Sequence, residues 1–139
     1  MIPVNYLAVV VAAIANMALG FLWYGPLFGK KWIALMQFTP EHMAAAKAKG
    51  MTKQYSFLAL TSLLTSYVLS AEIVFANAYF TTTGISGGLM AGFWSWLGFI
   101  VPITLGTVLW EGKSWTLWVL NAGYYLVALC AMGAVLASF

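Results

Sequence analysis

The chain alternates between long apolar stretches and polar connections. Four apolar stretches cover residues 4–28, 55–80, 87–110 and 115–138. A helix needs about 20 mainly apolar residues to cross a hydrocarbon core of about 30 Å, and each stretch meets that length. None shows the strict apolar–polar alternation of strands in a membrane β-barrel. The pattern therefore predicts an all-α, polytopic membrane protein, folded as an antiparallel bundle of four transmembrane helices with mostly short connections.

The one long connection, residues 29–54, has a helical pattern of its own. Thr39, Pro40 and Glu41 form a typical helix start, with a capping hydroxyl, a proline at the first helical position and an acid in the first turn. Alanines and lysines follow as far as Gly50, a common helix terminator. We expect a short helix lying at the cytoplasmic interface of the membrane. The sequence leaves open whether this helix senses lipid, docks a partner or only connects two spans.

Composition supports the membrane class and excludes several others. Of 139 residues, 63% are hydrophobic and 6% are charged, with six lysines, no arginine, three acids and one histidine. Soluble domains average about 25% charged residues, and six lysines are too few to follow a nucleic-acid backbone. A single cysteine, Cys130, excludes a disulfide framework and a zinc site built from thiolates. We expect one membrane domain over residues 1–139, with no metal, no cofactor and no nucleic-acid partner.

The lysines predict how the chain is oriented. Five of the six lie in residues 29–54, and Lys113 lies in the connection at residues 111–114. By the positive-inside rule both connections are cytoplasmic, so both termini face outward. No lysine precedes Lys30, and the first apolar stretch is as long as a membrane span. We therefore expect a retained helix there rather than a cleaved signal peptide.

Small residues in the third stretch predict close helix packing. Glycines and other small residues at three- and four-residue spacing let two membrane helices approach closely. The partner is either another helix of the same bundle or a second copy in a homo-oligomer, and the sequence allows both. The glycines concerned are Gly84, Gly88, Gly92 and Gly98.

One acidic residue, Glu72, lies inside an apolar stretch, and ionisable groups in lipid are costly enough to suggest a function. Its helix face also carries Ser62 and Thr65, so it points to a partner helix or a cavity. Glu72 is either a ligand or proton site, with aromatic faces that would suit a cation, or a polar contact that holds helices together. The residues expected to form a polar, aromatic-walled centre with it are Asn16, one of Trp94 and Trp96, Asn121 and Tyr125.

Several segments together resemble domain-of-unknown-function family 1761, a family of small bacterial membrane proteins. These segments are residues 23–30 (WYGPLFGK), 94–99 (WSWLGF), 109–114 (LWEGKS) and 121–126 (NAGYYL), followed by Met-Gly-Ala at 132–134. The resemblance implies a four-helix protein of a bacterial cytoplasmic membrane, with no established activity. It also favours a second candidate centre near the lysine-rich side, because its segments meet there. That centre comprises Trp23, Tyr24, Pro26, Glu111, Trp118, Asn121 and Tyr125.

We expect no enzymatic activity. No two carboxylates can lie together for acid–base catalysis, and no histidine accompanies Cys130 or a serine. The leading hypothesis is a small homo-oligomeric membrane protein that binds or transports a small molecule, an ion or a lipid through a polar, aromatic-lined centre. The alternative is a non-transporting accessory or scaffold subunit that packs against partner helices.

Overall fold

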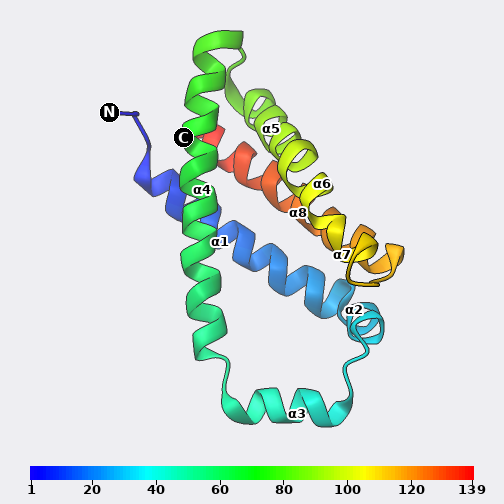
Figure 1. Cartoon of the computed structure of the whole chain (residues 1–139). Helices are drawn as coiled ribbons and strands as arrows, with labels where there is room; N and C mark the ends of the chain where they lie inside the picture. The colour runs from blue at the N-terminus through cyan, green and yellow to red at the C-terminus, as the bar shows by residue number, and fades with distance from the viewer.

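The computed structural model describes all 139 residues and is entirely helical (Figure 1). Four helical segments are long and apolar enough to cross a membrane, namely Tyr6–Leu27, Thr52–Phe80, Gly84–Leu109 and Trp115–Ala137. The predicted all-α class and its four long apolar helices are confirmed, and no segment end differs from the prediction by more than three residues. The elements are α1 (Tyr6–Leu22), η1 (Trp23–Leu27), α2 (Gly29–Met36), α3 (Pro40–Lys49), α4 (Thr52–Phe80), α5 (Gly84–Ser95), η2 (Trp96–Ile100), α6 (Val101–Thr104), α7 (Gly106–Leu109) and α8 (Trp115–Ala137).

The connection between α1 and α4 contains two short helices. Helix α3 covers the segment where a short helix is expected, and the Thr39 side chain caps it by accepting a hydrogen bond from the His42 amide at 3.1 Å. It ends at Gly50, whose φ of +82° is readily available to glycine. The sequence pattern does not predict α2, which is followed by Gln37 in the left-handed region.

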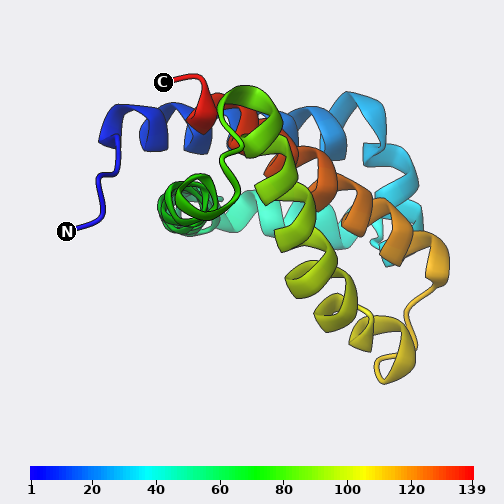
Figure 2. The same cartoon turned by 90° about the horizontal axis from the view of Figure 1, so that it is seen from above.

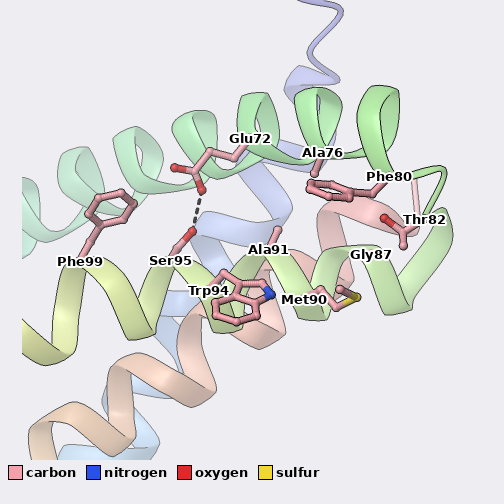
Figure 3. Close-up of a pocket in the computed structure, with 10 residues that line it drawn as sticks. All are labelled: Glu72, Ala76, Phe80, Thr82, Gly87, Met90, Ala91, Trp94, Ser95 and Phe99. Atoms are coloured by element: carbon pink, nitrogen blue, oxygen red, sulfur yellow. Dashed lines mark hydrogen bonds between the residues drawn. The ribbon is translucent and has the colours of Figure 1, made fainter.

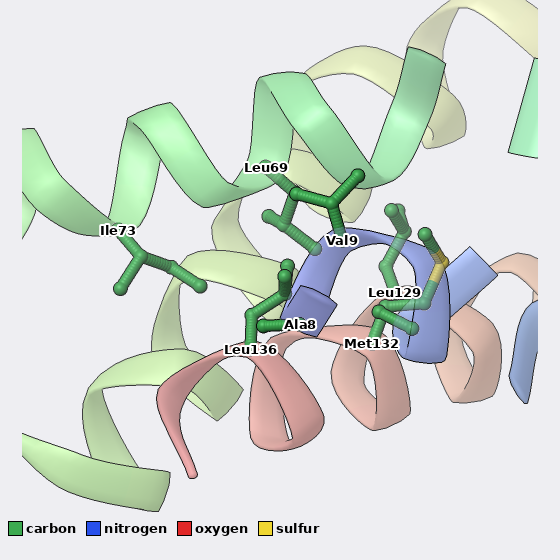
Figure 4. Packing of buried hydrophobic residues seen from close by; sticks show 8 residues of the cluster. Ala8, Val9, Leu69, Ile73, Leu129, Met132 and Leu136 are labelled. Carbon is green, nitrogen blue, oxygen red and sulfur yellow. The ribbon is translucent and has the colours of Figure 1, made fainter. Parts of the chain in front are cut away.

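Helix α8 is the central element, because α1, α4 and α5 all pack against it. The buried core lies where α1, α4 and α8 meet, and Figure 4 shows its side chains interlocking between the three helices. Ala8 and Ala12 are almost fully buried and bring α1 close to its neighbours. The other core members are Val9, Leu69, Ile73, Leu129, Met132 and Leu136.

Helices α5 and α8 touch backbone to backbone through glycines. A Cβ atom added at Gly88 would lie 2.0 Å from the Gly133 carbonyl oxygen, and one added at Gly92 would lie 2.5 Å from that of Leu129. These two glycines therefore make their close contacts within the chain. Gly84 instead adopts a φ of +71° at the start of α5, and neither it nor Gly98 would have a neighbouring atom within 4 Å of an added Cβ.

Two membrane-length segments contain a π-helical turn beside a proline. Pro26 lies inside η1, and Pro102 lies two residues after the end of η2 in the third segment. Proline cannot donate the usual helical hydrogen bond, so a local change of helix type accommodates it. Each turn begins with a tryptophan that donates to an α8 carbonyl: Trp23 Nε1 to Leu120 O at 3.1 Å and Trp96 Nε1 to Ala122 O at 2.8 Å.

The helices do not form a closed ring. Helix α4 and the α5–α7 segment are joined at residues 81–83 and diverge from that turn, as Figures 1 and 2 both show. Helix α5 follows α8, whereas α4 lies against α1. One side of the assembly, between α4 and α5, is therefore open.

Candidate functional site

The open side contains a groove between α4 and α5, which we call the α4–α5 groove. Its largest cavity, the first, has a volume of about 610 Å³ (Figure 3). Most of its wall is apolar, and Glu72 is the charged residue in it. The lining residues are Glu72, Ala76 and Phe80 of α4, Thr82 of the turn, Gly87, Met90, Ala91, Trp94 and Ser95 of α5, and Phe99 of η2.

Glu72 links the two walls of the groove. Its Oε2 atom accepts a hydrogen bond from Ser95 Oγ at 2.6 Å, across the opening between α4 and α5 (Figure 3). A distance this short is typical of a hydroxyl donating to a carboxylate. Oε1, the other oxygen, has no hydrogen-bond partner in the chain and remains accessible. The carboxylate can therefore hold the helices together and still offer one oxygen to a ligand.

Aromatic side chains stand around this carboxylate. Phe80, Trp94 and Phe99 line the first cavity on either side of Glu72 (Figure 3). Trp94 is 60% exposed and Phe99 is 62% exposed, so their rings face the open side of the groove. The sequence leaves open which of Trp94 and Trp96 lies near Glu72, and the structure places Trp94 there. Trp96 turns to α8 instead and donates to the Ala122 carbonyl.

The groove continues along α4 beyond the first cavity. A second cavity of about 280 Å³ shares Glu72, Ser95 and Phe99 with the first. A third, also of about 280 Å³, adjoins the second and reaches Asn16 and Tyr125. The residues common to the second and third cavities are Thr65, Ile100 and Leu129.

Asn16 is the centre of a hydrogen-bond network that joins three helices. Its Nδ2 atom donates to Ser62 Oγ of α4 at 2.8 Å, and its Oδ1 atom accepts from the Tyr124 hydroxyl of α8 at 2.7 Å. Tyr124 is 7% exposed, whereas the predicted centre contains its neighbour Tyr125. Leu117, Leu120 and Tyr124 share the buried face of α8, but Trp118, Asn121 and Tyr125 have the same spacing, so the sequence carries no signal that separates the two faces.

The second predicted centre is a packed aromatic cluster. The Tyr24 hydroxyl donates to Asn121 Oδ1 at 2.8 Å, and the Tyr24 ring lies edge-on to Tyr124 with centroids 5.2 Å apart. Trp118 Nε1 donates to Thr104 Oγ1 at 3.0 Å, so this indole contacts α6. Glu111 is exposed in the turn before α8. Tyr24, Trp118 and Asn121 therefore join helices and line none of the three cavities, whereas Tyr124 and Tyr125 line the third.

The predicted site residues thus lie in three separate places. Glu72 and Trp94 share the first cavity, and Asn16 and Tyr125 share the third. Asn121 lies in the aromatic cluster with Trp23 and Tyr24, whereas Trp118 donates to Thr104 of α6. No three His, Cys, Asp or Glu side chains lie together as metal ligands would.

Comparison with known proteins gives one match. The family model described as "Protein of unknown function (DUF1761)" matches residues 7–137, which is nearly the whole chain. No curated protein and no solved structure matches the chain.

Proposed function

This chain belongs to the DUF1761 family of proteins of unknown function, and we propose that it is a small integral membrane protein that binds a lipophilic cation. The site is the first cavity of the α4–α5 groove. The observation that carries the proposal is a lone accessible carboxylate, Glu72, in an apolar cavity of about 610 Å³ with aromatic walls.

The chemistry of the cavity favours an organic cation over a metal ion. A calcium ion takes six to eight oxygen ligands, and magnesium a full octahedron, whereas this cavity offers one carboxylate, Glu72, and the hydroxyls of Ser95 and Thr82. An organic cation whose charge is surrounded by apolar groups needs fewer oxygen ligands. One carboxylate at about 4 Å supplies roughly 4 kcal/mol at an effective dielectric constant of about 20. An aromatic face such as that of Trp94 adds about 0.5–2 kcal/mol.

The shape of the groove indicates that the ligand enters from the bilayer. The groove opens sideways, between two helices long and apolar enough to cross a membrane. Trp94 and Phe99 are largely exposed along that opening. A molecule dissolved in the hydrocarbon would therefore reach Glu72 without first passing through water.

The lysine distribution supports an orientation for the site. With residues 29–54 and 111–114 in the cytoplasm of a bacterial cell, both termini and the 81–83 turn lie outside. Glu72 is eight residues before Phe80, the end of α4, so it lies about 12 Å below that end. The proposed binding site is then in the outer half of the cytoplasmic membrane.

A pair of ions with matched shape tests the proposal. Equilibrium dialysis of the purified protein in mild detergent compares tetraphenylphosphonium with tetraphenylborate, which carries the opposite charge. We expect the cation to bind and the anion not to bind. Glu72→Gln should weaken cation binding at least tenfold, because it removes the charge and keeps the shape. Glu111→Gln is the matched control and should leave binding unchanged, because Glu111 is exposed and lines none of the three cavities.

Two results would contradict the proposal: equal binding of both ions, or wild-type affinity in Glu72→Gln. The hydrogen bond from Ser95 to Glu72 supports a second candidate function, a scaffold subunit in which Glu72 only joins α4 to α5. That candidate is favoured if the wild-type protein binds no cation and Glu72→Gln lowers the stability of the fold. Assembly into a homo-oligomer is part of the proposal in both cases, and analytical ultracentrifugation in detergent measures it.

A further inference from the structure

Three adjoining cavities, the first two in the α4–α5 groove and the third where it continues between α4, α1 and α8, follow one another along α4. The first and second share Glu72, and the second and third share Thr65. Along α4 the path runs from Phe80 to Leu58. Those 22 residue steps correspond to about 33 Å of helix, and the hydrocarbon core of a bilayer is about 30 Å thick. The groove is therefore long enough to cross the membrane.

The path also carries acceptor groups at intervals along its length. After Glu72, the next polar side chain that lines the path on α4 is Thr65, about 10 Å further along, and Ser62 and Thr61 follow after about 5 and 6 Å. Both threonine hydroxyls donate to carbonyls of their own helix, Thr65 Oγ1 to Thr61 O and Thr61 Oγ1 to Phe57 O, each at 2.9 Å. Their donors are occupied, so what each offers to the groove is an oxygen lone pair.

A path that contains one carboxylate and no cationic side chain favours positively charged groups. An ammonium group is attracted by a carboxylate and by hydroxyl lone pairs, whereas a phosphate needs donors. The three cavities contain no lysine or arginine, and all six lysines lie outside the groove. Without a lysine or arginine to neutralise it, an anionic phosphate headgroup is poorly served along this path, whereas a simple ammonium headgroup is attracted by Glu72.

From this geometry we propose that the α4–α5 groove carries the headgroup of an alkylammonium amphiphile across the membrane, while the alkyl chain stays in the lipid beside the open side. This activity rests on the proposed function, since Glu72 is the first binding site on the path. It goes beyond that function because binding needs only the first cavity, whereas passage needs all three.

The test reconstitutes the full chain in liposomes and follows a fluorescent alkyltrimethylammonium that carries a nitrobenzoxadiazole group on its chain. Dithionite added outside destroys the fluorophore in the outer leaflet only. Empty liposomes should keep about half of the signal, and proteoliposomes should lose nearly all of it. Acyl-labelled phosphatidylglycerol, which has a phosphate and no ammonium, should keep its inner-leaflet signal in both.

A block placed below Glu72 separates passage from binding. Thr65 lines the second and third cavities but not the first. Thr65→Trp should therefore slow the loss of the inner-leaflet probe at least tenfold, and it should leave tetraphenylphosphonium binding within about twofold of wild type. Leu63→Trp adds an equally bulky side chain to α4 outside all three cavities and should behave as wild type. Should Thr65→Trp fail to fold, Thr65→Cys is modified with a bulky maleimide after reconstitution. The wild-type chain, treated in the same way, shows the effect of modifying Cys130 alone.

The outcomes distinguish the two proposals. Intact cation binding with the inner-leaflet signal kept as in empty liposomes, or a blocked Thr65 with wild-type probe loss, overturns the passage and leaves the binding site in place. Equal transfer of phosphatidylglycerol also overturns it, because the path would then not select an ammonium headgroup. Absence of cation binding overturns the proposed function itself.

Discussion

Replacing Gly88 by alanine tests the contact that holds α5 against α8. The added Cβ would lie 2.0 Å from the Gly133 carbonyl oxygen, 2.5 Å from the Gly133 carbonyl carbon and 2.9 Å from the Ala137 Cβ. Two of these atoms belong to the backbone, so no rotation of a side chain can relieve the clash. The helices must separate until the closest distance rises from 2.0 Å to at least 3.0 Å.

A separation of about 1 Å has a calculable effect. A gap of 0.5–1 Å removes about a quarter to a half of the 0.1–0.2 kcal/mol that each atom pair contributes. For about 40 atom pairs, as many as one buried leucine makes, the loss is about 1–4 kcal/mol. Alanine recovers up to about 1 kcal/mol through its higher helix propensity. With that recovery in full, we expect Gly88→Ala to lower the free energy of unfolding by up to about 3 kcal/mol, and by about 1–4 kcal/mol relative to a glycine-to-alanine change without the clash.

The measurement is unfolding by sodium dodecyl sulfate in mixed micelles, followed by circular dichroism. Gly98→Ala is the control, because it makes the same chemical change in the same membrane-length segment with no atom within 4 Å of the new Cβ. It should leave stability unchanged or raise it slightly. The double variant Gly88→Ala with Gly133→Ala should lose less than the sum of the two single losses, because one separation relieves both clashes. Equal stability of Gly88→Ala and Gly98→Ala would refute the reasoning.

Three further substitutions test other contacts. Tyr124→Phe removes the hydrogen bond to Asn16 Oδ1 and should lower stability by about 0.5–1.5 kcal/mol in the same unfolding assay; no loss would mean that the bond is not formed. Trp96→Phe removes the donor to the Ala122 carbonyl and should cost a similar amount, whereas an unchanged midpoint would assign that indole no role in packing. Thr39→Ala removes the cap of α3, costing about 1 kcal/mol, and should speed amide hydrogen exchange in that helix alone; unchanged exchange would contradict the assigned cap.

The helix positions could be predicted from the sequence because the bilayer imposes a length and local residues fix the ends. The apolar stretch that includes Phe80 ends at the residue where α4 ends, and Thr39 and Gly50 bound α3 as their chemistry suggests. Helix α2 escaped prediction because it begins with Gly-Lys-Lys, which carries no cap signal. The π-helical turns escaped as well, since a proline predicts a disturbed helix without specifying the form that the disturbance takes.

The sequence could not predict which face of each helix is buried. For this reason the residues predicted to form one site do not all lie together. A helix that is apolar all round has no stripe to mark its buried side, so Tyr124 and Tyr125 looked alike although one is 7% exposed and the other 40%. Trp94 and Trp96 were equally indistinguishable. What separates them is one hydrogen bond: Trp96 donates to the Ala122 carbonyl. That acceptor is known only once α8 is in place.

The segments that carry the family resemblance are those that fix α8. Residues 23–30 contain η1, residues 94–99 reach into η2, and residues 121–126 include two of the acceptors, Asn121 and Ala122. The donors Trp23, Tyr24 and Trp96 bond to three successive residues of α8, namely Leu120, Asn121 and Ala122. These motifs thus have a structural role that needs no ligand. The second predicted centre, near the lysine-rich side, is accordingly a point of assembly in this fold.

Glu72 differs because it lies where the helices part. In water an open side lined by Phe80, Trp94 and Phe99 would close to bury its apolar surface. In lipid that force is absent, since the hydrocarbon solvates these side chains as well as another helix would. Helix contacts then depend on close backbone approach and hydrogen bonds, which α5 makes with α8 through Gly88 and with α4 through one bond, Ser95 to Glu72. In a bilayer, an open groove around a carboxylate would therefore be stable, and it would place an ionisable group within direct reach of molecules dissolved there.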